Sequence, residues 1–310
     1  MSAQVTQSAN TLSAEFSFKS SDGLRIAYGR WDSHDPVRGV IQIAHGLGEH
    51  IGRYAQTIEV LVSAGLTVYG NDHRGHGRTA PDNAHLGDFG EGGFDLLVDD
   101  MVCLSRIAKD ENQNLPFILF AHGMGSFAAQ EYVLDHSREI DALILSGSGA
   151  LDRLAQLGTS TSVCSNVLNA NFEPVLTPFD WLSRDTGVVN AFMNDPLCFA
   201  DLQPKAFVSF LGAASELSDP LRLGDIRDDL PIYLFSGSED PIGQQLEGLA
   251  LLIHRYEKAG LYDISHDFYI GGRHEMLNEI NREEVRERLL AWISSILEGP
   301  SYRPKASTDA

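Results

Sequence analysis

The sequence contains few cysteines and few basic residues. Its three cysteines lie far apart along 310 residues, so they outline neither a disulfide framework nor a zinc motif, and we expect reduced thiols at Cys103, Cys164 and Cys198. Lysine and arginine number 23 against 43 aspartates and glutamates, which gives a formal net charge of −20. Because binding to a phosphate backbone needs clustered basic side chains, this composition argues against a nucleic-acid-binding protein.

Long apolar runs are absent as well. No stretch approaches the roughly 18 consecutive apolar residues of a membrane span, and the first residues have neither the basic patch nor the apolar run of a secretory signal. We therefore expect a cytoplasmic protein, whose acidity opposes stable association with anionic membranes. With 43% hydrophobic residues, the chain can bury a large core as one domain, or as one domain with an inserted subdomain. The sequence leaves a homo-oligomer open.

Short apolar runs rich in β-branched residues alternate with longer segments of helical periodicity. This alternation is typical of a parallel sheet covered by helices on both faces. The predicted strands are residues 40–44, 67–71, 116–121, 142–145 and 232–236. The stretch 15–31, interrupted by Ser21, Asp22 and Gly23, predicts an antiparallel hairpin at the edge of the sheet. Open α/β sheets bind ligands beyond the carboxyl ends of their strands, so a site is expected in the turns that follow.

The alternation stops between residues 149 and 223. Short helical segments with scattered aromatic residues take its place, which predicts an inserted helical cap. The sheet pattern resumes near residue 230, and a last helix is predicted over 282–297. The predicted organisation is a first part of the core over residues 15–148, a cap over 149–223 and a second part of the core over 224–298.

Two glycine-rich turns follow predicted strands. The first, AHGLGEH at residues 44–50, has two glycines that let the backbone turn sharply and present N–H groups to a ligand oxygen, although a plain tight turn would have the same composition. The second, FAHGMGS at residues 120–126, joins a strand to a helix. Ala121 and Gly125 satisfy the demand of a nucleophile elbow for small residues on either side of its centre. The central residue, Gly123, has no side chain.

Two further strand ends supply an acid and an imidazole. SGSEDP at residues 236–241 contains Asp240, and GGRHE at residues 271–275 contains His274. Taken alone, an aspartate at a strand end is usually a helix cap, and a single histidine is usually structural. The order elbow, aspartate, histidine is nevertheless the order of a nucleophile, acid and base triad on such a sheet. The four turns together therefore indicate a catalytic site.

These motifs resemble those of bacterial lysophospholipase and monoacylglycerol-lipase-like members of the α/β-hydrolase superfamily. The resemblance runs from about residue 15 to 298 and includes HGLGEHIGRY, NDHRGHGRT, NDPLCF, SGSEDP and GGRHEMLNEINREEV. It implies an α/β-hydrolase fold, in which helices flank a mostly parallel sheet and a helical cap is inserted. It also implies hydrolysis of a small-molecule carboxylic ester, with no metal and no organic cofactor.

The resemblance implies a role for each motif. His274 would be the general base, and Asp240 would orient and stabilise its imidazolium. The backbone N–H groups of Leu47 and Met124 would form the oxyanion hole. The family places its nucleophilic serine at position 123, commonly within GHSMG, where this chain has AHGMG. Alanine for the first glycine is a small exchange, whereas glycine for serine removes the reacting atom.

Three explanations account for Gly123. In the first, a parent protein has serine at this position and the present chain is its inactive variant. In the second, the chain is a natural non-nucleophilic member of the superfamily, either a ligand binder or a lyase-type enzyme. In the third, Ser126 replaces the nucleophile, but a residue three positions into the next helix is expected to point elsewhere.

Several further residues are candidates for contact with a substrate. From their place in the turns or among the cap aromatics we predict Gly46, His50, His122, Phe172, Phe179, Trp181 and Phe192. The cap aromatics could equally form the core of the cap, and the histidines could pack against the elbow. His73 and His76 suggest a metal site, but no third ligand stands beside them in the sequence, so a structural turn is predicted there.

Overall fold

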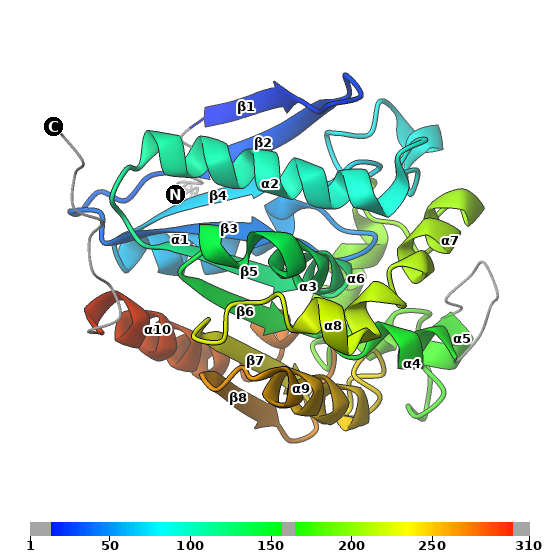
Figure 1. Ribbon diagram of the computed structural model, residues 1–310. Helices are drawn as coiled ribbons and strands as arrows, with labels where there is room; N and C mark the ends of the chain where they lie inside the picture. Colours follow the sequence, from blue (N-terminus) through cyan, green and yellow to red (C-terminus); the bar gives the residue numbers. More distant parts are fainter. Residues whose placement is uncertain (1–13, 157–164, 300–310) are drawn as a thin grey trace, which may run out of the picture.

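The computed structural model describes residues 14–156 and 165–299, which form one eight-stranded sheet with helices on both faces (Figure 1). The strand order is β1-β2-β4-β3-β5-β6-β7-β8. Strands β3 to β8 are mutually parallel, while β2 is antiparallel to both β1 and β4. The predicted α/β-hydrolase fold, with its N-terminal hairpin at the sheet edge, is confirmed.

The strands lie where the apolar runs predict them, to within about one residue for the central five. Their bounds are β1 Ala14–Lys19, β2 Arg25–Trp31, β3 Gly39–Ala44, β4 Leu66–Asn71, β5 Phe117–His122, β6 Ala142–Ser146, β7 Ile232–Gly237 and β8 Ile264–Tyr269. In β5, Phe117 and Leu119 pack on one face of the sheet and Ile118 and Phe120 on the other. Because successive side chains alternate between two covered faces, the central strands are apolar along most of their length.

Two groups of helices cover the two faces. Helices α2 (Gly93–Glu111), α3 (Met124–His136) and α9 (Glu247–Ala259) bury their apolar residues on one face. Helices α1 (Ala55–Ser63) and α10 (Arg282–Glu298) do so on the other. No helix within the described residues is long and apolar enough to cross a bilayer.

The chain between β6 and β7, residues 147–231, is called the insert below. Its described part consists of short helices at the carboxyl ends of the strands, on the right in Figure 1. Their bounds are α4 Leu151–Ala155, α5 Ser165–Leu168, α6 Thr186–Asn194, α7 Pro204–Gly212 and α8 Pro220–Leu223. The cap bounds of 149 and 223 stay a prediction.

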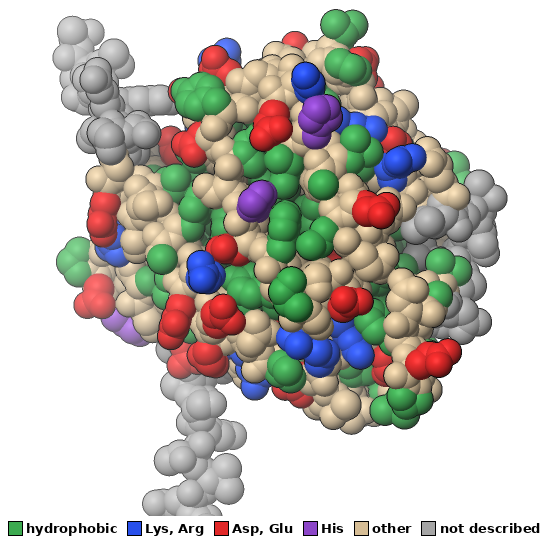
Figure 2. Space-filling model, turned by 90° about the horizontal axis from the view of Figure 1, so that it is seen from below, with side chains coloured by type: hydrophobic (Ala, Val, Ile, Leu, Met, Phe, Trp, Pro, Cys, Tyr) green, Lys and Arg blue, Asp and Glu red, His purple; other side chains and the backbone are tan. Residues whose placement is uncertain are grey.

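Strand β8 forms one edge of the sheet, and Figure 2 shows the molecule from that side. Acidic and basic side chains surround a central group of apolar ones on this face. Asp267, within β8, pairs with Arg288 of α10 at 3.5 Å. Charged side chains along an edge strand oppose pairing with the edge of another sheet.

The start of α3 packs closely against the end of β3, and Gly125 is the residue that permits this. A Cβ atom added at Gly125 would lie 2.5 Å from the carbonyl oxygens of both Ala44 and His45. Such a distance requires backbone to move. The contact explains in physical terms why an elbow needs a small residue two positions after its centre.

We predict that Gly125→Ala lowers the free energy of unfolding by about 1–3 kcal/mol, because the helix must move off the strand. Gly212→Ala is the matched control, since a Cβ atom at Gly212 meets nothing within 4 Å. That variant should be unchanged or more stable by up to about 1 kcal/mol. Urea unfolding of both variants measures the difference, and equal stabilities would refute the close contact.

Candidate active site

Gly123 lies at the sharp turn between β5 and α3. Its backbone has φ 53° and ψ −123°, in the left-handed range that favours glycine. A Cβ atom built on Gly123 would lie 3.1 Å from Nε2 of His274. A side chain at this position would therefore project directly at the imidazole. The turn thus has the geometry of a nucleophile elbow without a nucleophile.

Asp240 and His274 are brought together by the ends of β7 and β8, although 34 residues separate them. Nδ1 of His274 lies 3.0 Å and 3.1 Å from the two carboxylate oxygens of Asp240. The hydroxyl of Ser236 and the N–H of Ile242 also donate to this carboxylate, at 2.8 Å and 2.9 Å. Both members of the pair are buried. The hydrogen bonds leave Nε2 of His274 facing position 123.

Burial and charge act in opposite directions on His274. Burial disfavours the imidazolium, but the charge and hydrogen bond of Asp240, helped by Glu275 and Glu49, outweigh it and raise the pKa of His274 above its usual value. Burial likewise disfavours the Asp240 carboxylate, yet His274 and the donated hydrogen bonds lower the pKa of Asp240. The pair is therefore suited to hold a proton on the imidazole.

Gly147 makes room for the imidazole ring. Its φ is 55°, and a Cβ atom there would lie 2.7 Å from Cε1 and 2.8 Å from Nδ1 of His274. The ring of Trp181 lies on another side, with its centroid 5.0 Å from that of His274. The His122 ring is 4.5 Å away. These contacts leave the imidazole little freedom to rotate.

The turn after β3 lies opposite the elbow. Gly46 donates its N–H to Oε1 of Glu49 at 2.6 Å, and His45 contacts the carbonyl oxygen of Gly46 through Nδ1 at 2.8 Å. Nε2 of His45 accepts the N–H of His73 at 2.9 Å. Burial lowers the pKa of His45 to about 4, so the ring is neutral and can donate at one nitrogen while it accepts at the other.

A buried ionic network lies beside the imidazole, and the sequence analysis did not identify it. Arg53 donates two hydrogen bonds to Glu275, at 2.7 Å and 2.8 Å, and a third to Glu49 at 3.1 Å. Tyr54 and Asn278 donate further hydrogen bonds to the same two carboxylates. The only signal in the sequence is that Glu49 and Glu275 stand next to predicted site residues.

A cavity of about 50 Å³ lies between the elbow, the imidazole and the insert. Its lining residues are Gly46, Leu47, Glu49, His122, Gly123, Met124, Trp181, Leu182, Phe210, Ile242, His274 and Glu275. The backbone N–H groups of Leu47 and Met124 donate to no acceptor within the described chain. An oxygen atom of a ligand could therefore accept hydrogen bonds from both.

The structure brings most of the predicted site residues together, but not all. Gly46, Leu47, His122, Gly123, Met124, Trp181 and His274 line the cavity, and Asp240 lies behind the imidazole. Phe172, Phe179, Phe192 and His50 are not among the described residues that line it. Phe192 and Phe179 pack on each other at 4.8 Å, and Phe172 packs on the Arg273 guanidinium at 4.3 Å.

Ser126 is hydrogen-bonded beneath the elbow. It is fully buried, and its hydroxyl lies 2.6 Å from the carbonyl oxygen of Gly123 and 2.8 Å from the Ser148 hydroxyl. It is not among the described residues that line the cavity. The position of its hydroxyl agrees with the expectation that Ser126 points away from the reacting position.

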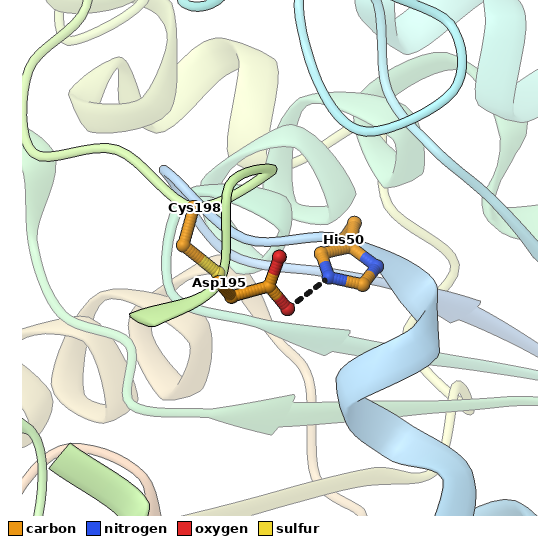
Figure 3. A group of neighbouring side chains, drawn as sticks. All are labelled: His50, Asp195 and Cys198. Carbon is orange, nitrogen blue, oxygen red and sulfur yellow. Dashed lines mark hydrogen bonds and ion pairs between the residues drawn. The ribbon is translucent and has the colours of Figure 1, made fainter. Parts of the chain in front are cut away.

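Metal-ligating side chains come together at one place within residues 14–156 and 165–299, and it does not include His73 or His76. The group consists of His50, Asp195 and Cys198 (Figure 3). His73 and His76 are fully buried and pack around His45. Cys103 and Cys198 are free thiols, while Cys164 lies outside the described residues.

Comparison with known proteins places the chain among hydrolases. The family described as serine aminopeptidase, S33, matches residues 35–281. A monoacylglycerol lipase of Mycolicibacterium smegmatis is 31% identical over 286 residues, which cover 92% of this chain and 98% of that protein. The human monoglyceride lipase is 26% identical, with 88% of each chain covered. A thermostable carboxyl esterase from Bacillus coagulans, solved in complex with glycerol, has a TM-score of 0.82 at 30% identity, over 92% of this chain and 98% of that one.

We predict that Asp240→Asn lowers the pKa of His274, because burial then acts on the imidazole without the opposing carboxylate. In the unmodified protein the pKa of His274 is raised above its unfolded value of roughly 6.5. Its contribution to stability is therefore fully present below about pH 6.5 and is lost as the pH rises through the folded pKa. The unmodified protein should therefore be more stable than Asp240→Asn below about pH 6.5, and this difference in the free energy of unfolding should narrow as the pH rises.

Titration of the imidazole by NMR, with urea unfolding at about pH 6 and pH 9, measures both effects. Asp263→Asn, at an exposed carboxylate beside β8, is the control and should leave both quantities unchanged. If His274 titrates with the same pKa in the unmodified protein and in Asp240→Asn, the carboxylate of Asp240 is not the cause of the raised pKa.

Proposed function

Because the chain belongs to the serine aminopeptidase S33 family of α/β-hydrolases, we propose that its parent form is a carboxylic ester hydrolase of the monoacylglycerol-lipase type. In this proposal Gly123 stands where the parent has serine, so the present chain is nearly inactive. The observation that carries the proposal is the 3.1 Å between a Cβ atom at position 123 and Nε2 of His274, which Asp240 holds from behind.

The proposed reaction proceeds in two steps. The hydroxyl oxygen of a serine at position 123 attacks the ester carbonyl carbon while His274 Nε2 accepts its proton, and the alcohol then leaves with that proton. A water molecule attacks the acyl-enzyme with the same base, which releases the acid and restores the serine. Asp240 keeps the imidazole in the tautomer with its proton on Nδ1 and stabilises the imidazolium.

We assign the oxyanion hole to the N–H groups of Leu47 and Met124. Both residues line the cavity beside position 123, and both amides are without an acceptor in the described chain. Donors fixed in place before the reaction stabilise the developing oxyanion without reorganising. His45 supports this arrangement, because the carbonyl of Gly46 that it contacts belongs to the same peptide plane as the Leu47 N–H.

The proposed substrate is a small-molecule ester, as the names of the relatives suggest. We propose that Gly46, His122 and Trp181 contact it, since they line the cavity. About 50 Å³ is far below the roughly 300 Å³ of an ordinary ligand site, so side chains that line the cavity must move to admit an acyl chain. A cytoplasmic location stays part of the proposal.

A natural protein without a nucleophile is the second candidate, and the absence of a side chain at position 123 favours it. The φ of 53° does not separate the two candidates, because a nucleophile elbow imposes the same strained conformation on its serine. The missing side chain leaves the imidazole free to act on a bound ligand. Such a protein would bind a ligand or transfer a proton without an acyl-enzyme. Restoring the serine separates the two candidates.

We predict that Gly123→Ser raises kcat/KM on short and medium acyl esters by several orders of magnitude. The estimate follows from the loss of order 10⁶ in turnover on removal of the serine from such a triad. Hydrolysis of chromogenic esters, with detection of the acyl-enzyme by mass spectrometry, measures the gain.

Gly123→Ala is the matched control, because it adds the same Cβ atom and the same backbone strain without a hydroxyl. We expect it to stay as inactive as the present chain. A folded Gly123→Ser protein that is no more active than Gly123→Ala would exclude a serine hydrolase as the parent form.

Two substitutions of His45 in the Gly123→Ser background test the support of the oxyanion hole. His45→Asn keeps a donor near the place of Nδ1 and should retain most of kcat, whereas His45→Gln keeps an acceptor near Nε2 and loses the contact with Gly46. We expect His45→Gln to lower kcat by about 10²-fold with little change in KM. Equal kcat values in the two variants would contradict this role.

A further inference from the structure

His50, Asp195 and Cys198 gather on one side of the turn that follows β3, outside the cavity described above (Figure 3). One ligand atom from each residue lies within 4.8 Å of the other two. Nε2 of His50 and Oδ2 of Asp195 are 2.9 Å apart. All three side chains are partly exposed, so an ion could reach them from solvent.

The backbone holds these residues in place. The N–H groups of Leu197 and Cys198 donate to Asp195, one to its carboxylate at 2.9 Å and one to its carbonyl at 3.1 Å. The N–H of Phe199 donates to the carbonyl oxygen of Gly48 at 2.9 Å, which fixes the loop after α6 on the core. Ligands held in this way need little rearrangement to bind an ion.

We propose that His50, Asp195 and Cys198 bind one zinc ion between the insert and the core. Zinc binds well to a combination of thiolate, imidazole and carboxylate ligands. Magnesium and calcium bind such a site less well, because they prefer oxygen ligands alone. Three protein ligands leave a fourth tetrahedral position for water. The ion would bridge η1 (Ile51–Tyr54), which His50 caps, to the end of α6.

The surrounding charges are compatible with a cation. Arg53 is the basic group that acts on Cys198, but its guanidinium is already paired with Glu49 and Glu275. The three carboxylates of Glu49, Glu275 and Asp195 together carry more negative charge than the Arg53 guanidinium carries positive charge. Burial raises the pKa of the Cys198 thiol to about 12, so zinc must displace its proton.

Two existing hydrogen bonds oppose the ion. Nδ1 of His50 accepts the N–H of Gly52 at 3.2 Å, so without zinc the ring proton lies on Nε2 and faces Asp195. Coordination through Nε2 moves that proton to Nδ1, which ends both the hydrogen bond with Asp195 and the contact with Gly52. Two hydrogen bonds are a small loss beside three metal–ligand bonds.

The test uses the full chain without a polyhistidine tag, reduced and then freed of metal with a chelator. Zinc competition with a chromogenic indicator should give one site per chain, and cobalt should give the charge-transfer band of a thiolate ligand. Cys198→Ser should weaken zinc binding by more than about 100-fold and abolish that band. Cys103→Ser, at the other described free thiol, is the matched control and should leave both unchanged.

Calorimetry in two buffers of different ionisation enthalpy should show a proton released as zinc binds, since the thiol must ionise. Asp195→Asn provides a second variant and should also weaken binding. Equal zinc affinity in the unmodified, Cys198→Ser and Asp195→Asn proteins, or a cobalt spectrum without a thiolate band, would overturn the proposal. None of these measurements depends on esterase activity.

Discussion

The close approach of α3 to the end of β3 is the constraint on which the candidate site depends. Gly125 permits it, because its missing side chain lets the helix contact the carbonyl oxygens of Ala44 and His45. The approach brings Met124 toward the turn that contains Leu47, and both residues line one cavity. A helix displaced by one methyl group would separate the two donors. The proposed oxyanion hole would therefore depend on this backbone packing, with the His45 side chain as its support.

The electrostatics of the site depend on two buried carboxylates with separate partners. Asp240 interacts with His274, while Glu275, the next residue along the chain, is held on Arg53 by two hydrogen bonds. Burial opposes ionisation of Glu275, yet Arg53 lowers its pKa. Because this charge is compensated, Glu275 adds only a secondary stabilisation to the imidazolium. Among the described residues, Asp240 is the one that accepts a hydrogen bond from the ring.

Much of this could be predicted from the sequence, because the sheet places the ends of its strands at one edge. Asp240 follows the apolar strand β7 and His274 follows β8, its parallel neighbour, so their proximity follows from strand order. The insert could not be predicted in the same way. Phe172 and Phe192 pack on the guanidinium groups of Arg273 and Arg53, and no local periodicity encodes contacts between such distant segments. Strand β8 is not among the apolar runs that predict the central strands, since ISHDFY begins with the polar alternation of an edge.

The Asp240–His274 pair is not explained by stability. A buried ion pair gains little over apolar residues of the same volume, because desolvation offsets much of its attraction. This pair also needs a glycine with positive φ, Gly147, to make room for the ring, and glycine lowers stability through its entropy in the unfolded chain. The imidazole nitrogen that remains faces position 123, where the backbone takes a conformation that would strain any side chain. Several destabilising features thus meet at one point, which is the usual signature of a site shaped by chemistry rather than by folding.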